Sequence, residues 1–166
     1  MDEPLRPLVD VYWVVPGILL AGEAPSGRDE AAIREKLDWL RDEGATFFID
    51  LREEGSMSYE HLLPEDLPYR RMGIPDFGTP APEAMKKILD TIDSSIAGGH
   101  TVYIHCAAGR GRTGTVVGCW LARHGRPGEA ALAELMRLRE AALSRHERSP
   151  ETDEQREMVR RWREGE

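Results

Sequence analysis

Cysteine and lysine are scarce in this chain of 166 residues. Its two cysteines, Cys106 and Cys119, cannot build the disulfide framework of a small secreted domain, so they indicate separate roles in a reducing compartment. Only three lysines accompany nineteen arginines, and the formal net charge is −8. A chain this acidic lacks the broad positive field that general binding to nucleic acid or to an anionic membrane requires.

Long apolar runs are also missing. No stretch approaches the roughly twenty apolar residues of a membrane-spanning helix. The opening residues, Met1 to Pro4, lack the basic and then apolar pattern of a signal peptide. These absences predict a cytoplasmic protein without a membrane span. The length fits a single domain over residues 1–166, with residues 1–10 as a loosely held N-terminal segment, and we expect a monomer.

The order of the predicted elements indicates an α/β domain, because strand-like and helix-like segments alternate along the chain. We expect a central, mostly parallel sheet of four to five strands that is flanked by helices. The predicted strands lie within residues 11–21 (two short strands around a turn), 45–51, 67–72 and 101–104, and the predicted helices are 29–43, 82–97, 113–124, 127–143 and 150–163. The last two helices each have a proline in the predicted first turn.

The most specific segment is His105–Gly114, which reads HCAAGRGRTG and places Cys106 and Arg112 six positions apart. A predicted strand precedes it and a predicted helix follows it. Backbone N–H groups at such a helix start are unpaired, and the helix dipole adds positive charge, which suits a phosphate and a thiolate. The residues expected to hold the phosphate form a signature loop that consists of Cys106, Ala107, Ala108, Gly109, Arg110, Gly111 and Arg112.

The residue types in this segment define a nucleophile and its support. A cysteine reacts as the thiolate, and helix termini and nearby cations lower a thiol pKa, so Cys106 is the predicted nucleophile. The planar guanidinium of Arg112 matches two phosphoryl oxygens. Thr113 can donate its hydroxyl to the Cys106 sulfur, and His105 can orient the loop by bonding its backbone or can bias Cys106 toward the thiolate. No residues show metal-ligand spacing, and we expect neither a metal nor a cofactor.

At this point the sequence resembles a known family. HCAAGRGRTG resembles the motif H-C-x-x-G-x-x-R-[ST] of the cysteine-dependent protein tyrosine and dual-specificity phosphatases. Residues 73–80, GIPDFGTP, resemble the general-acid loop of the smaller dual-specificity enzymes, especially the subgroup of the cyclin-dependent-kinase-associated phosphatase, with Asp76 at the acid position. Residues 13–22 are a weaker match to the opening hairpin of such domains. The resemblance extends from near residue 12 to near residue 162.

The resemblance implies a protein-tyrosine-phosphatase-like fold and a phosphatase that works through a phosphocysteine on Cys106, with Asp76 as general acid and base. Its substrate would be phosphotyrosine, with phosphoserine and phosphothreonine as further candidates. Arg110 stands where phosphoinositide phosphatases of this superfamily carry lysine, which leaves inositol phosphates, phosphoinositides or other small phosphoesters as an alternative. Arg110 could equally be a loop residue that points into solvent. A third alternative is a non-catalytic protein that binds phosphoproteins, against which the intact Cys106, Arg112 and Asp76 argue.

A last candidate lies in residues 149–155, SPETDEQ. Related phosphatases place a glutamine there that positions the hydrolytic water, and either Gln155 or Glu151 could fall at that place. The alternative interpretation is an acidic first helical turn that needs only Ser149 as its cap and Glu151 near its start.

Overall fold

A five-stranded sheet forms the centre of the computed structural model, which describes residues 6–166. In the sheet the strands have the order β1-β2-β5-β3-β4, and only β1 runs antiparallel to its neighbour. The prediction of a mostly parallel sheet is therefore confirmed. The strands are β1 (Val11–Val15), β2 (Leu19–Gly22), β3 (Phe47–Asp50), β4 (Tyr69–Arg71) and β5 (Val102–His105).

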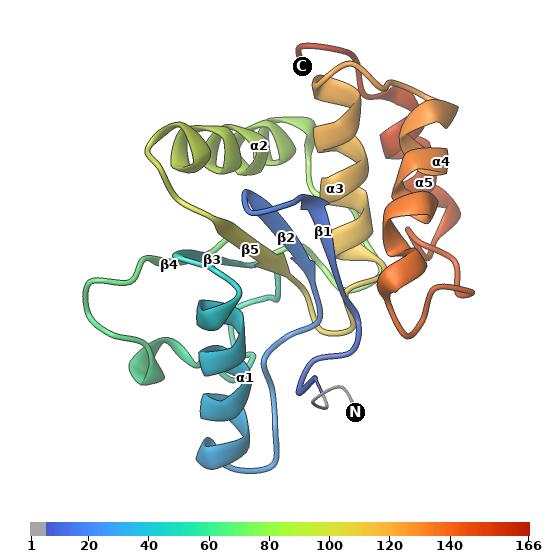
Figure 1. Cartoon of the computed structure of the whole chain (residues 1–166). Helices are drawn as coiled ribbons and strands as arrows, with labels where there is room; N and C mark the ends of the chain where they lie inside the picture. The colour runs from blue at the N-terminus through green and yellow to red at the C-terminus, as the bar shows by residue number, and fades with distance from the viewer. Residues whose placement is uncertain (1–5) are drawn as a thin grey trace.

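Helices cover both faces of this sheet, so the domain has three layers (Figure 1). Helix α1 lies on one face, and α2 to α5 lie on the other. None of the helices within residues 6–166 is long and apolar enough to cross a membrane. The helices are α1 (Glu30–Asp42), α2 (Pro82–Ala97), α3 (Arg112–Arg123), α4 (Glu129–Leu138) and α5 (Asp153–Arg161), with short 3₁₀ turns at Glu60–Leu62 and Arg139–Ala141.

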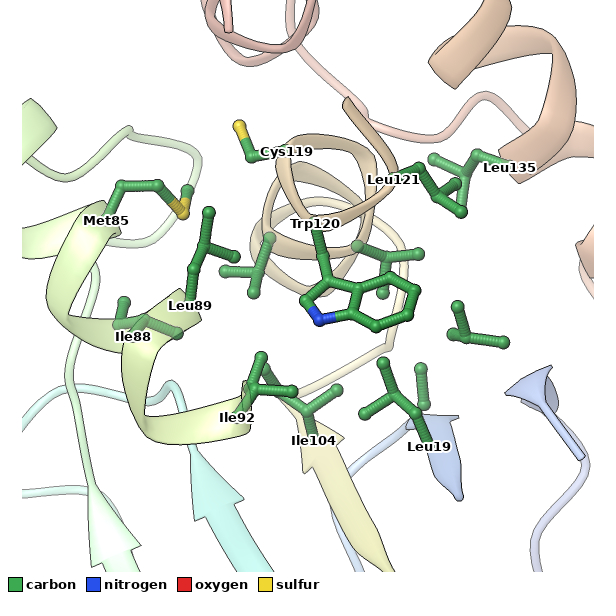
Figure 2. Close-up of a cluster of buried hydrophobic side chains, with 14 of the residues drawn as sticks. Leu19, Met85, Ile88, Leu89, Ile92, Ile104, Cys119, Trp120, Leu121 and Leu135 are labelled. Carbon is green, nitrogen blue, oxygen red and sulfur yellow. The ribbon is translucent and has the colours of Figure 1, made fainter. Parts of the chain in front are cut away.

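Strand β5 is buried on both faces, as expected of a central parallel strand. Its side chains alternate between two apolar clusters: Ile104 belongs to the cluster beneath α2 and α3, and Tyr103 belongs to the cluster beneath α1. Figure 2 shows Trp120 of α3 pointing toward the sheet, between Leu19 on one side and Ile92 of α2 on the other. This packing on both faces fixes the carboxyl end of β5, where the signature loop begins.

The last two helices differ from their predicted bounds. Helix α4 begins at Glu129 because Gly128 has φ = +69°, a left-handed backbone conformation that a helix cannot contain. Helix α5 begins at Asp153 because Thr152 accepts a hydrogen bond from the Gln155 amide and forms a capping box with that side chain. The cap is thus Thr152 and not Ser149, and neither proline lies in a helical first turn.

The N-terminal segment also departs in part from expectation. Residues 1–5 of the predicted loose segment 1–10 lie outside the described residues. Leu8, in contrast, is fully buried against the α1 side of the sheet. The Asp10 carboxylate accepts hydrogen bonds from the Ser144 amide at 2.7 Å and from its hydroxyl at 2.6 Å. Residues 8–10 are therefore held in place by contacts with distant parts of the chain.

Candidate active site

The signature loop connects the carboxyl end of β5 to the start of α3. Cys106 directly follows the last residue of β5, and Arg112 is the first residue of α3. The loop therefore lies where the positive end of the α3 dipole and its unpaired N–H groups favour an anion. The strand, turn and helix that the sequence predicts around Cys106 are all present.

Cys106 is nearly enclosed by its own loop. Only 3% of the residue is exposed, and the Gly109 amide donates a hydrogen bond to its sulfur at 3.3 Å. Thr113 does not make the predicted bond to this sulfur: within residues 6–166 its buried hydroxyl has no hydrogen-bond partner. A backbone amide of the loop thus makes the bond to the sulfur that the Thr113 hydroxyl was expected to make.

Two other segments hold the signature loop in shape. From one side, the Ala24 amide donates to the Ala107 carbonyl at 3.0 Å. From the other side, the Ser149 hydroxyl donates to the Arg110 carbonyl at 2.6 Å. The loop also approaches β2 so closely that a Cβ atom on Gly109, which has φ = +81°, would lie 2.6 Å from the backbone of β2. These contacts organise the loop amides before any substrate arrives.

His105 lies behind the loop as a neutral ring. Its Nδ1 is 3.0 Å from the Cys106 carbonyl oxygen, which can only accept, so Nδ1 carries the proton. Its Nε2 then accepts a hydrogen bond from the Tyr59 hydroxyl. Complete burial lowers the pKa of His105 to about 4, although the nearby Asp50 carboxylate opposes this shift. His105 therefore bonds the loop backbone and carries no positive charge near neutral pH.

The Asp50 carboxylate at the end of β3 is buried and ionised. Arg52 binds both of its oxygens, through Nε at 3.0 Å and Nη2 at 2.9 Å, and the Tyr69 hydroxyl donates at 2.7 Å. Burial alone would raise the pKa of Asp50, but the hydrogen bonds from Arg52 and Tyr69 and the proximity of His105 lower it to about 2. This network joins β3 to β4 beside His105 and leaves Asp50 without a proton to give.

Arg112 and Asp76 meet at the mouth of the site. The Arg112 Nη2 atom lies 3.2 Å from the Asp76 Oδ1 atom, and Arg112 Nη1 donates to the Ile74 carbonyl at 3.3 Å. The Arg112 side chain is 6% exposed, whereas that of Asp76 is 61% exposed. The tertiary structure thus brings a buried cation of the signature loop against a carboxylate that solvent can reach.

The acid loop, residues 73–80, carries Asp76 on a tight turn. The Gly78 amide donates to the Pro75 carbonyl at 2.8 Å, and the Phe77 amide donates to Asp76 Oδ1 at 3.1 Å. Phe77 itself has φ = +61°, which is unusual for a bulky side chain. The residue is 60% exposed. The turn presents the carboxylate of Asp76 and the ring of Phe77 together at the surface.

Gln155 and Glu151 both lie against the signature loop at Gly111. A Cβ atom on Gly111 would be 2.7 Å from Glu151 Oε1 and 3.3 Å from either polar atom of the Gln155 amide group. The Gln155 Oε1 atom accepts from the amides of Glu151 and Thr152 at 3.1 Å each, and its Nε2 donates to the Gly78 carbonyl at 3.1 Å. Gln155 therefore ties α5 to the acid loop, next to the signature loop.

Arg110 does not point freely into solvent. Its Nη1 atom is 2.5 Å from Glu147 Oε2, and its side chain is 26% exposed. This partner could not be predicted from the sequence, because Glu147 lies in an irregular segment.

Two further residues were missed. Tyr59 lies in a loop without a pattern, whereas Glu53 belongs to an Arg-Glu-Glu run that begins two residues after the end of β3. Glu53 Oε1 accepts a hydrogen bond from the Asp76 amide at 3.0 Å. Across residues 6–166, no group of three or more His, Cys, Asp or Glu side chains could hold a metal ion.

The known proteins that this chain resembles include phosphatases. The family model described as "Polymorphic toxin system, DSP-PTPase phosphatase" matches residues 22–126, which include both the acid loop and the signature loop. The dual specificity protein phosphatase CDC14B of Mus musculus is 27% identical over 122 residues, which cover 69% of this chain and 24% of the mouse protein. The chain therefore spans about a quarter of the length of that relative.

Solved structures show the same architecture over nearly the whole chain. The crystal structure of Tk-PTP in its active form is 26% identical, covers 90% of this chain and 93% of its own, and gives a TM-score of 0.72. Kinase associated phosphatase, solved with its catalytic cysteine replaced by serine, is 18% identical with a TM-score of 0.70, and 92% of each chain is covered. The second likeness shows the fold alone, which agrees with the expected phosphatase-like fold.

Proposed function

This chain belongs to the family of DSP-PTPase phosphatases, and we propose that it hydrolyses phosphotyrosine, and phosphoserine or phosphothreonine as well, through a phosphocysteine on Cys106. The observation that carries the proposal is the 3.2 Å contact of Asp76 with Arg112, the last residue of the loop that begins at Cys106. It supports a site in which a phosphate-binding fork and a proton donor lie next to each other, at the end of the loop that carries the proposed nucleophile.

In the first step the Cys106 thiolate attacks phosphorus, and an S–P bond forms as the P–O bond to the leaving group breaks. The loop amides and Arg112 hold the three equatorial oxygens. Asp76, in its protonated form, gives its proton to the leaving oxygen. The contact between Arg112 and Asp76 supports this assignment because a phosphate on Arg112 would lie next to Asp76.

In the second step water attacks phosphorus, and the S–P bond breaks to release inorganic phosphate and the thiolate. Asp76 now accepts the proton from this water. The Gly109 amide, 3.3 Å from the sulfur, stabilises the thiolate as leaving group. Gln155 remains a candidate for positioning the water through the second hydrogen of Nε2, since the first is bonded to the Gly78 carbonyl at 3.1 Å.

Phe77 favours an aromatic substrate. This residue is 60% exposed and directly follows the proposed acid. An exposed ring at this position offers apolar contact to the phenyl group of phosphotyrosine, which aliphatic phosphoesters lack. Phosphotyrosine is therefore the first substrate to test.

A second candidate function is hydrolysis of inositol phosphates, phosphoinositides or other small phosphoesters, and Arg110 is the observation that favours it. A second cation in the signature loop would attract a further phosphate. Glu147 already balances this cation at 2.5 Å, which makes a single phosphate the simpler ligand. We therefore rank the hydrolysis of inositol phosphates and other small phosphoesters below the hydrolysis of phosphorylated protein side chains. A phosphoprotein-binding role without turnover ranks last, because binding alone would not need the carboxylate of Asp76 against Arg112.

The experiment that tests the proposal is a phosphate-release panel. Peptides with phosphotyrosine, phosphoserine or phosphothreonine are compared with inositol phosphates and phosphoinositide vesicles, and the Cys106→Ser protein controls for contaminating phosphatases. The highest kcat/KM is expected for phosphotyrosine. Higher values for the inositol compounds would favour the second candidate, and no release from any substrate would favour the binding role.

A further inference from the structure

The acid loop is anchored to the rest of the domain on both sides of its turn. On the N-terminal side, the Ile74 amide donates to the Leu51 carbonyl at 2.9 Å. On the C-terminal side, Gln155 Nε2 donates to the Gly78 carbonyl at 3.1 Å. Between these anchors the Asp76 amide donates to Glu53 Oε1 at 3.0 Å. Glu53 is thus the side chain that holds the main chain of the proposed acid itself.

The contacts of Asp76 will change when a substrate binds. Its carboxylate now contacts Arg112 at 3.2 Å. A phosphate group in the signature loop requires the same guanidinium, so Arg112 must turn its donors toward the phosphoryl oxygens. The bond from the Asp76 amide to Glu53 does not use Arg112, and it can persist through both steps of the reaction. Glu53 then becomes the main remaining restraint on residue 76.

Glu53 is itself attached to a rigid part of the sheet. It directly follows Arg52, whose guanidinium is fixed by two hydrogen bonds to Asp50 at the end of β3. The Glu53 carbonyl accepts a hydrogen bond from Arg71 Nη1 of β4. Gly73, at the start of the acid loop, passes so close that a Cβ atom there would lie 3.2 Å from Glu53 Cα. The backbone of Glu53 is therefore held by two neighbouring strands.

We propose that Glu53 is a positioning residue that keeps Asp76 within reach of the leaving-group oxygen when Arg112 turns to the phosphate. This inference rests on the proposed function of Asp76. A carboxylate suits the role because its hydrogen bond to an amide is charge-assisted, and because it accepts without offering a competing donor. Displacement of a catalytic group by about 1 Å can cost about 10²-fold in rate, so a single bond of this kind has a measurable effect.

The test compares three variants on two aryl phosphates, one with a good leaving group and one with a poor one. Glu53→Ala removes the acceptor, Glu53→Gln keeps an acceptor oxygen without the charge, and Glu54→Ala is the control, because Glu54 is an exposed neighbour in the same run. For Glu53→Ala we expect kcat to fall about 10- to 100-fold with the poor leaving group and less than about threefold with the good one. Glu53→Gln should recover most of the loss, and Glu54→Ala should match the wild type.

A second measurement separates positioning from general damage to the fold. In an Asp76→Asn background, Glu53→Ala should cause no further loss of kcat, because its effect acts through the Asp76 carboxylate. Equal losses with both leaving groups, or a further loss in the double variant, would overturn the inference. So would a Glu53→Ala protein with wild-type kcat on the poor leaving group. If the wild-type protein released no phosphate from either ester, the proposed function would fail instead.

Discussion

The Arg112 guanidinium and the Asp76 carboxylate lie 3.2 Å apart, although one belongs to the first turn of α3 and the other to a surface turn. Because Asp76 is 61% exposed, this ion pair is screened by water and adds little to the stability of the fold. A phosphate that binds Arg112 can therefore displace the carboxylate at small cost. The same exchange would leave Asp76 next to a phosphate on Arg112, which is the position that the proposed proton donor requires.

Replacement of the nucleophile should separate binding from turnover. We expect Cys106→Ser to lower kcat for an aryl phosphate by about 10³-fold or more, because the hydroxyl is a poor nucleophile, while a phosphotyrosine peptide still binds the loop amides and Arg112. Phosphate release and calorimetric binding measure the two effects. Cys119→Ala is the matched control, since Cys119 is buried in the apolar core. Activity of Cys106→Ser within tenfold of the wild type would exclude a phosphocysteine.

Replacement of Arg112 should show that shape matters more than charge. Arg112→Lys keeps the charge but loses the planar fork, and we expect kcat/KM to fall by about 10²–10³-fold, as for the loss of an oxyanion donor. Arg110→Lys provides the comparison within the same loop and should stay within about threefold of the wild type on a monophosphate, because its ion pair with the exposed Glu147 is worth little and lysine keeps the charge. Similar kcat/KM values for Arg112→Lys and the wild type would contradict bidentate binding.

The proposed acid can be identified by leaving group and by pH. We expect Asp76→Asn to lower kcat by about 10²–10⁴-fold for a poor leaving group and much less for a good one. The alkaline limb of the kcat/KM profile should disappear in the same variant, because that limb follows loss of the proton from the acid. Asp66→Asn, at another exposed aspartate, should leave the profile unchanged. If the limb persisted in Asp76→Asn, another group would be the acid; Asp50 is a poor candidate because its pKa is about 2.

Burial of neutral His105 should make the fold sensitive to mild acid. Its pKa is lowered from 6.5 to about 4. Between these two pH values the unfolded chain therefore binds a proton at His105 that the folded chain does not bind. Stability is therefore fully present above pH 6.5 and is lost as the pH falls toward 4, by about 2 kcal/mol between pH 7.5 and pH 5. Urea unfolding at several pH values measures this loss. In His105→Gln the free energy of unfolding should fall by about 2 kcal/mol less between pH 7.5 and pH 5, so its slope against pH should be smaller. An unchanged slope in the variant would show that His105 is not the group responsible.

Close approach of β2 and the signature loop should make Gly109 intolerant of a side chain. A Cβ atom there would lie 2.6 Å from the Gly22 carbonyl carbon, and the backbone has φ = +81°. Gly109→Ala should shift the loop and reduce kcat/KM by about 10²-fold. Gly44 also has a positive φ, +114°, but a Cβ atom there would meet no other atom within 4 Å. Gly44→Ala should therefore only destabilise the fold, by roughly 1–2 kcal/mol. Equal activity of the two variants would contradict the role given to this contact.

The sequence predicted the elements whose ends are set locally. Helix α2 has its predicted bounds, Pro82–Ala97, because a proline at its first position and a glycine pair after it act on neighbouring backbone alone. The bounds of α4 and α5 were wrong for a related reason. Gly128 and Thr152 decide the two helix starts through a left-handed backbone and a capping box, and these signals competed with prolines nearby.

The contacts of the site could be predicted less completely. Thr113 directly follows the signature loop and was expected to bond the Cys106 sulfur, yet its hydroxyl makes no hydrogen bond within residues 6–166. Arg110 was expected to face either a substrate or solvent, and it contacts Glu147 instead. Motif spacing fixes which residues share a loop, but the direction of each side chain depends on segments that pack against the loop from elsewhere.

The sequence by itself determined the signature loop between a strand and a helix and the alternation of elements that makes an α/β phosphatase, because these follow from local hydrogen bonding and from apolar periodicity. Only the tertiary structure decided that Asp76 meets Arg112, that Glu53 holds the Asp76 amide, and that His105 is neutral. The first two are contacts between segments far apart in the chain. The third depends on complete burial of the ring, and burial exists only once the sheet and its helices have packed together.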